Sequence, residues 1–165
     1  MQRVVIAGFG FMGGMHAQAY AGIPEVELVG IADLDPARVK GQVDTLGVKA
    51  PVYSSLSEAL ERARPDVVDV CVPTDWHARV VLEALAAGKH VFCEKPLASS
   101  NAEAKAIIAA AKKAKVRFMT GHCIRFWPEY KGRDGCRTPI PWEEGEAPNG
   151  FSTGKPWLPV KPDHS

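Results

Sequence analysis

Short apolar runs alternate with longer, alanine-rich stretches from Arg3 to about Gly121. The runs are rich in β-branched residues and carry few polar positions, as is typical of parallel strands covered on both faces. The alternation predicts repeated βαβ units and an α/β fold with a doubly wound, mostly parallel sheet of six strands. The predicted strands are Val4 to Ala7, Val26 to Ala32, Val52 to Tyr53, Val67 to Val72, His90 to Cys93 and Arg117 to Thr120.

The stretches between these runs carry residues that start and stop helices. Asp35 precedes a proline, whose fixed φ suits a first helical turn, and its carboxylate can accept from a free backbone N–H group. Ser55 and Ser100 are each followed three residues later by a glutamate, which is the pattern of a capping box. Gly47 and Gly88 stand where a left-handed residue would end a helix.

The pattern changes after Tyr130. Residues 131–165 are rich in proline and glycine and show neither helical nor strand periodicity. We therefore expect an ordered domain over residues 1–130 and an irregular tail over residues 131–165. The tail is either a poorly ordered terminus, an arm that docks on another subunit through Trp142 or Trp157, or an abnormal end.

Composition narrows the class of protein. The chain has 165 residues, 46% of them hydrophobic and 24% charged, with a net charge of +1. Basic and acidic residues are interspersed, so we expect no nucleic-acid partner. No apolar run approaches the roughly 20 residues that span a bilayer, and no cleavable signal pattern follows Met1, so we expect a cytoplasmic protein without a membrane partner. The cysteines form no C-x-x-C pair, and Cys71 and Cys93 fall in strand-like runs, which predicts core thiols.

A glycine motif follows the first predicted strand. Gly8, Gly10 and Gly13 give the spacing G-x-G-x-x-G, directly before a predicted helix that starts at Phe11. In a dinucleotide-binding turn the first glycine permits a tight turn, the second lets the backbone approach a pyrophosphate, and the third allows close helix packing. The N–H groups of Phe11, Met12 and Gly13 would face the phosphates. In this context the motif predicts a Rossmann fold that binds a dinucleotide.

An acidic residue indicates which dinucleotide is bound. Asp33 ends the second predicted strand, where a carboxylate can accept hydrogen bonds from the adenosine ribose. A carboxylate there also repels a 2′-phosphate, so the sequence favours NAD over NADP. Arg38 works against this preference, because its side chain could reach a 2′-phosphate or stack on adenine. The alternative is a plain glycine-rich turn in which Asp33 only caps a strand.

Two further segments follow predicted strands at the same edge of the sheet: PTDWH, residues 73–77, and EKP, residues 94–96. Ligands bind beyond the carboxyl ends of the strands in open α/β sheets, so both segments should meet the cofactor. Together with GFGFMGGMH, the Asp33 strand end and GKHVFCEKPLA, they make residues 2–130 resemble the Gfo/Idh/MocA oxidoreductases, the family of glucose–fructose oxidoreductase and inositol dehydrogenase. The resemblance implies an enzyme that transfers hydride between NAD(P) and a sugar or polyol hydroxyl.

The resemblance also implies roles for individual residues. Lys95 would be the catalytic residue, beside the nicotinamide, where it handles the hydroxyl proton. Glu94 would help position Lys95 and the nicotinamide ribose, and the bond between Lys95 and Pro96 is expected to be cis. Thr74 and His77 would contact the ribose and phosphate region of the cofactor.

Other interpretations of several residues stay open. Thr74 or Asp75 could simply cap the next helix, and His77 could be a solvated surface residue. His16 recurs in the family's first helix, and we expect it to pack against the next strand rather than bind a ligand. Arg125, after the sixth strand, either closes the cofactor site or takes no part in it.

The resemblance ends near Tyr130. Family members continue into a second α/β domain that forms the floor of the substrate pocket, helps form dimers and supplies a D-x-x-x-H pair, and residues 131–165 lack that spacing. We therefore expect an oxidoreductase interrupted by a frame change or an early end, which keeps cofactor binding and is either still active or has lost turnover. Exposed apolar surface would favour a homo-oligomer. The alternative is a non-catalytic NAD(P)-binding or regulatory module.

Overall fold

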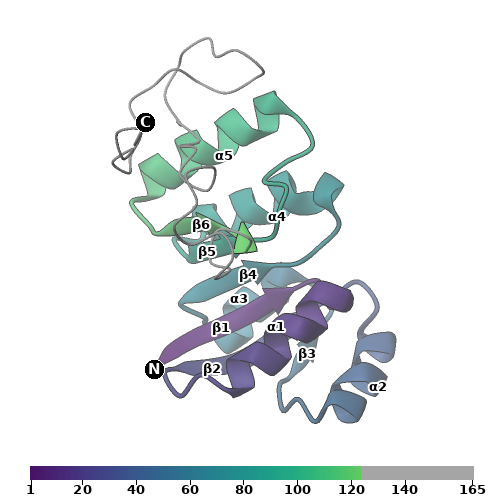
Figure 1. The fold of residues 1–165 in the computed structure, drawn as a ribbon. Coiled ribbons are helices and arrows are strands. Elements are labelled where there is room, and N and C mark those ends of the chain that lie inside the picture. Colours follow the sequence, from purple (N-terminus) through teal and green to yellow (C-terminus); the bar gives the residue numbers. More distant parts are fainter. Residues whose placement is uncertain (124–165) are drawn as a thin grey trace, which may run out of the picture. The chain divides into compact units, whose positions relative to one another are not determined.

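Six parallel strands form one sheet in the order β3-β2-β1-β4-β5-β6 (Figure 1). The structure is a computed structural model that describes residues 1–123. Its strands are β1 (Gln2–Ala7), β2 (Val26–Ala32), β3 (Val52–Tyr53), β4 (Val67–Val70), β5 (His90–Cys93) and β6 (Phe118–Thr120). Its helices are α1 (Phe11–Ala21), α2 (Pro36–Leu46), α3 (Leu56–Ala63), α4 (Thr74–Ala86) and α5 (Asn101–Ala114). The predicted doubly wound α/β fold is confirmed, and every pair of neighbouring strands is parallel.

The helices cover the two faces of the sheet in separate groups (Figure 1). Ile6 and Ile31 belong to a buried cluster with residues of α1 and α2. Val5 and Val68 belong to a second, larger cluster with residues of α3, α4 and α5. Successive residues of a strand point to opposite faces, which is why Val5 and Ile6 lie in different clusters. Both faces are therefore covered, as the continuous apolar strands predicted.

The chain changes direction across the sheet between β3 and β4. After β3, at one edge, it returns through α3 to place β4 beside β1. The strand order therefore reverses between β1 and β4, and the crevice at such a reversal is where open α/β sheets bind ligands. The turn after β1 and the segment after β4 meet there.

Most predicted boundaries agree with the structure, and β4 is the main correction. We predicted that it would extend to Val72, but it ends at Val70. The N–H of Cys71 still donates to the carbonyl of Ala7, at 2.8 Å. Beyond that bond the backbone of Val72 lies against Gly8 instead of continuing the ladder.

The predicted helix caps are confirmed. Asp35 accepts from the third residue of the turn it starts, and Ser55 and Ser100 each accept from a glutamate N–H three residues later. The carboxylate of each of these glutamates in turn accepts from the N–H of the residue before the capping serine, at 3.1 and 3.2 Å. Gly47 and Gly88 have the expected positive φ, 65° and 69°.

The compact unit ends at Gly121, and the predicted boundary at residue 130 and the tail lie outside the described residues. Within residues 1–123, no helix has both the length and the apolar character needed to cross a membrane.

The turn after β1 is closed by two glycines. Gly8 has φ +91°, and a Cβ there would lie 2.7 Å from the backbone nitrogen of Val72. At Gly13 a Cβ would collide with the carbonyl oxygen of Gly8. The backbones of β1, α1 and the segment after β4 therefore meet where a side chain on either glycine would not fit, as predicted for the first and third glycines of the motif.

We predict that Gly13→Ala lowers the free energy of unfolding by about 1 to 3 kcal/mol, because the methyl group forces the helix away from the turn. Gly41→Ala is the matched control, since that glycine lies on the exposed side of α2 and a Cβ added there would meet nothing within 4 Å. The control should gain roughly 0.5 to 1 kcal/mol from helix propensity. Urea unfolding followed by circular dichroism measures both, and equal effects of the two substitutions would contradict the proposed close contact.

Candidate functional site

The start of α1 is shaped to receive an anion. Gly10 precedes the helix in an extended conformation, and no side chain caps the N-terminus. A Cβ on Gly10 would meet nothing within 4 Å, so the space in front of the turn is open. Unpaired N–H groups at a helix N-terminus carry partial positive charge and bind phosphates. The N-terminus of α1, where Phe11, Met12 and Gly13 lie, therefore fits a pyrophosphate, the role predicted from the motif.

Asp33 lies directly beside this turn and is tied to it. Its Oδ2 accepts from the N–H of Phe9 at 2.8 Å, and its Oδ1 accepts from the N–H of Asp35 at 2.9 Å. The guanidinium of Arg38 lies 3.0 Å from Oδ2 and also donates to the carbonyl of Phe9, at 3.1 Å. Partial burial would raise the pKa of Asp33, but these N–H groups and the guanidinium together lower it. Asp33 is therefore an ionised acceptor at the end of β2, as predicted.

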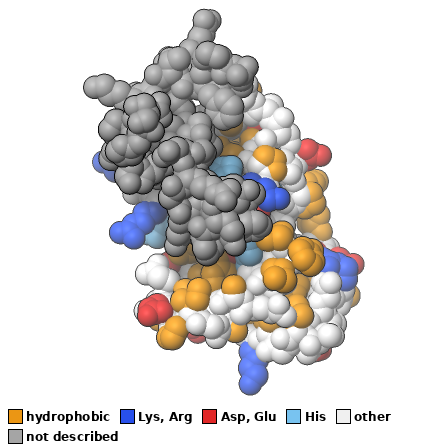
Figure 2. Space-filling view, viewed as in Figure 1, with side chains coloured by type: hydrophobic (Ala, Val, Ile, Leu, Met, Phe, Trp, Pro, Cys, Tyr) orange, Lys and Arg blue, Asp and Glu red, His pale blue; other side chains and the backbone are white. Residues whose placement is uncertain are grey.

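Apolar side chains are exposed around the turn. Figure 2 shows hydrophobic side chains gathered on the surface over α1 and beside its N-terminus. Phe11 is 82% exposed, and Leu34, which follows Asp33, is 83% exposed. Large apolar side chains so exposed next to a polar turn suit a ligand with both a flat ring and charged groups.

The segment after β4 leads directly into α4. Pro73 precedes the helix and makes no side-chain cap, and Thr74 is the first residue of α4. The interpretation that Thr74 or Asp75 caps this helix is therefore wrong. The carboxylate of Asp75 instead accepts from the hydroxyl of Ser99, at 2.8 Å. Thr74 lies at a helix start that no side chain caps, in the segment that borders Gly8.

His77 lies beneath this segment. It is 1% exposed, so the alternative of a solvated surface residue is wrong. Its Nδ1 lies 2.8 Å from the carbonyl oxygen of Pro96, and its Nε2 lies 2.9 Å from the carbonyl oxygen of Val72. The ring thus joins the segment after β4 to the segment after β5. Each ring nitrogen lies within hydrogen-bond distance of a backbone carbonyl, and a neutral ring donates to one of the two.

The segment after β5 carries the predicted catalytic residue. Lys95 is exposed, and the peptide bond between Lys95 and Pro96 is cis, as expected. Glu94 is 7% exposed, and its Oε2 accepts from the N–H of Lys95 at 3.1 Å. Lys95 therefore lies between two residues with contacts inside the protein: Glu94 through its carboxylate and Pro96 through its carbonyl oxygen.

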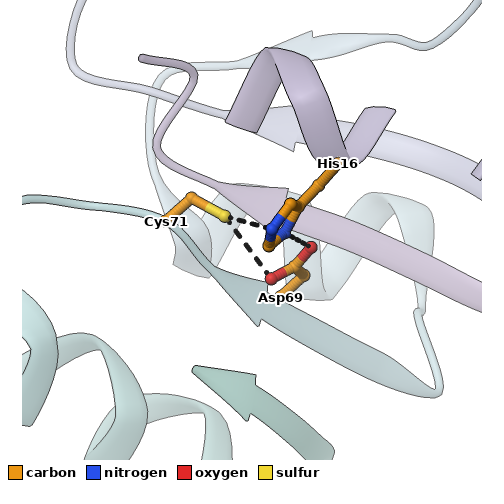
Figure 3. A group of neighbouring side chains, drawn as sticks. All are labelled: His16, Asp69 and Cys71. Atoms are coloured by element: carbon orange, nitrogen blue, oxygen red, sulfur yellow. Dashed lines mark hydrogen bonds and ion pairs between the residues drawn. The ribbon is translucent and has the colours of Figure 1, made fainter. Parts of the chain in front are cut away.

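A partly buried polar cluster joins α1 to β4 (Figure 3). Nδ1 of His16 lies 2.8 Å from Oδ2 of Asp69, which also accepts from the hydroxyl of Tyr20 at 2.8 Å. The thiol of Cys71 donates to Oδ1 of Asp69, at 3.5 Å, and its sulfur lies 3.3 Å from Nδ1 of His16. Asp69 is fully buried, so these donors replace the water that a carboxylate would otherwise need.

The side chains of this cluster are joined by hydrogen bonds. Ligand atoms of His16, Asp69 and Cys71 lie within 4.8 Å of one another, close enough to consider a metal ion. The hydrogen bond to Asp69 raises the pKa of His16, which favours the protonated ring. Burial, reinforced by the charge of Asp69, raises the pKa of the Cys71 thiol. This environment therefore favours a protonated imidazole and a protonated thiol.

Sequence reasoning undervalued this cluster. His16 was expected only to pack against the next strand, and no role was given to Asp69 or Tyr20. Two signals were present: an acid inside the apolar run VVDVCV needs a buried partner, and His16 and Tyr20 stand four residues apart on one helical face. The predicted site residue Arg125 lies outside the described residues.

Comparison with known proteins identifies the family. A family described as "Oxidoreductase family, NAD-binding Rossmann fold" (Gfo/Idh/MocA) matches residues 2–122. The chain belongs to this family, which confirms the predicted resemblance and the prediction of NAD as the family's cofactor.

Two curated relatives are dehydrogenases. The chain is 35% identical over 129 residues to myo-inositol 2-dehydrogenase of Thermotoga maritima, and 31% identical over 128 residues to inositol 2-dehydrogenase of Rhizobium meliloti. Each alignment covers 78% of this chain and 38% of the relative, so the chain spans well under half the length of these relatives.

A solved structure supports the fold and the cofactor. GenD2 from gentamicin A biosynthesis, in complex with NAD, superimposes with a TM-score of 0.74 at 29% identity, covering 83% of this chain and 39% of GenD2.

The raised pKa of His16 predicts a pH-dependent stability. The pKa lies above the value of 6.5 expected in the unfolded chain. The contribution of the protonated ring to stability is therefore fully present below pH 6.5. This contribution should be lost as pH rises through the folded-state pKa. Urea unfolding at a series of pH values should show the decline in the native chain and a flatter profile in His16→Gln. Parallel profiles would contradict the prediction.

Proposed function

We propose that this chain binds NAD across the carboxyl edge of its sheet and supplies Lys95 for hydride transfer between that cofactor and a sugar or polyol hydroxyl. One observation carries the proposal. The glycine turn, Asp33 and the EKP segment, which are far apart in sequence, follow β1, β2 and β5, and parallel strands all end at the same edge of the sheet.

The phosphates are assigned to the N-terminus of α1. The open space at Gly10, the uncapped helix start and the positive end of the helix dipole all support this assignment. Thr74, at the start of α4, is assigned to the same side of the cofactor.

The adenosine ribose is assigned to Asp33. A carboxylate offers about four acceptor positions, and Phe9, Asp35 and Arg38 occupy three of them. One position remains for a ribose hydroxyl, and a second hydroxyl would compete with Arg38. The same negative charge repels a 2′-phosphate, which supports NAD rather than NADP as the bound form.

Lys95 is assigned to the reacting hydroxyl. Oxidation of an alcohol removes a hydride from carbon, which NAD would accept when bound, and a proton from oxygen. Nζ of Lys95 would take that proton, and the exposure of this side chain leaves it free to reach the substrate. The sugar or polyol class is supported by the two relatives, both inositol dehydrogenases.

The ratio of the affinities for NADH and NADPH tests the assignment of Asp33. We expect Asp33→Ser to weaken NADH binding and to strengthen NADPH binding, with the affinity ratio shifting about tenfold or more, because Arg38 becomes free to pair with the 2′-phosphate. Asp35→Ser removes a nearby charge while keeping a helix cap, so it should leave the ratio unchanged. Fluorescence titration with both cofactors gives the ratio. A shift of similar size in both variants would assign the effect to charge alone.

Binding and turnover test the proposal as a whole. The full chain should bind NADH, and Lys95→Met should keep that binding while reducing polyol-dependent formation of NADH by roughly 100-fold or more. Lys105→Met on the exposed side of α5 is the control and should behave as the native chain does. Absence of dinucleotide binding would overturn the proposal. Binding without turnover on any polyol would instead support the second candidate, a non-catalytic NAD-binding module.

A further inference from the structure

Glu94 is turned back into the protein. Its Oε2 accepts from the N–H of Lys95, and its Oε1 lies 3.4 Å from Nε2 of His16. Gly121, after β6, makes room for this conformation, because a Cβ there would lie 3.0 Å from Oε1. The side chain thus bridges the backbone of the following residue and a histidine from a distant helix. A carboxylate so engaged acts as a support for Lys95.

His16 is itself held in place. Its other nitrogen, Nδ1, is bonded to the fully buried Asp69 of β4 (Figure 3). Its ring packs against Phe92 and Tyr20, with centroid distances of 5.7 and 6.5 Å. One imidazole therefore connects α1, β4 and the end of β5.

We propose that His16 is a positioning residue of the nicotinamide site: its ring links Glu94 to Asp69 and so fixes the segment that carries Lys95. This inference rests on the proposed function, in which Lys95 lies beside the nicotinamide. It differs from the role that the family resemblance implies for Glu94, because the support of Glu94 comes from α1, the helix whose N-terminus faces the phosphates.

The link depends on the charge of His16. A protonated imidazole donates at both nitrogens and can serve two carboxylates, whereas a neutral ring donates at only one. The titratable groups that face His16 are Tyr20 of its own helix, Asp69 and Cys71 from β4 and its end, and Glu94 beyond β5. The two carboxylates favour the charged ring. Deprotonation removes one of the two donors, and the ion pair with Glu94 is the longer contact, at 3.4 Å against 2.8 Å for the hydrogen bond to Asp69.

Nuclear magnetic resonance tests the link without any cofactor. The N–H of Lys95 donates to Glu94, so its chemical shift should titrate with the same midpoint as the ring of His16, above pH 6.5. In His16→Asn this titration of the Lys95 amide should disappear. A chemical shift of the Lys95 amide that does not change as His16 ionises would overturn the inference.

Two ligands separate positioning from general stability. NADH and ADP share the adenosine and pyrophosphate parts, and only NADH carries the nicotinamide and its ribose. We expect His16→Asn, which can still donate to Asp69 but is too short for Glu94, to weaken NADH binding about tenfold and leave ADP binding unchanged. The NADH affinity of the native chain should decline as rising pH deprotonates His16. His16→Gln, whose amide can reach Glu94, should restore most of the NADH affinity and show no such decline.

The outcomes are distinct. Equal weakening of both ligands would show a purely structural role for His16 and overturn the inference, as would an unchanged affinity for NADH. Failure of the native chain to bind either ligand would instead contradict the proposed function. In that case a normal coupled titration of the Lys95 amide would still establish the link between His16 and the EKP segment.

Discussion

The approach of α1 to the turn after β1 is the contact on which the rest of the site depends. Gly13 lies against the carbonyl of Gly8, and Gly8 lies against the backbone after β4, so three segments meet at a distance that excludes a side chain. This contact fixes the N-terminus of α1 over the edge where β1 and β4 end. It also determines where the next turns of the helix fall. His16 is three residues beyond Gly13, close to one helical turn, and so reaches Asp69 on β4.

Lys95 combines a free side chain with a fixed backbone. Glu94 before it is held by His16 of α1, and Pro96 after it is held through its carbonyl by His77 of α4. The two histidines belong to helices that cover opposite faces of the sheet. A reactive group is placed most accurately when its neighbours are locked by packing and hydrogen bonds. Here that locking comes from both sides of the sheet, while the amine itself stays exposed.

The elements were predictable because their signals are local. Apolar runs, the caps at Asp35, Ser55 and Ser100, and the glycine spacing each depend on a few adjacent residues, and parallel strands bring their carboxyl ends to one edge by geometry alone. The supports of the site were not predictable in this way. The partners of His77 are backbone carbonyls, which have no sequence signature, and the link from His16 to Glu94 joins distant parts of the chain and depends on tertiary packing. The end of β4 was overestimated because Cys71 and Val72 are as apolar as the strand before them.

The environment of Cys71 and Cys93, at the carboxyl ends of β4 and β5, determines their reactivity. Burial raises the pKa of Cys93 to about 12, and burial together with the charge of Asp69 raises the pKa of Cys71. Peroxides and alkylating reagents attack the thiolate, so a thiol held protonated reacts slowly. Cys71 is only partly buried, yet the carboxylate that organises the cluster also protects its sulfur. Both thiols are therefore held in the protonated form, which reacts slowly with oxidants.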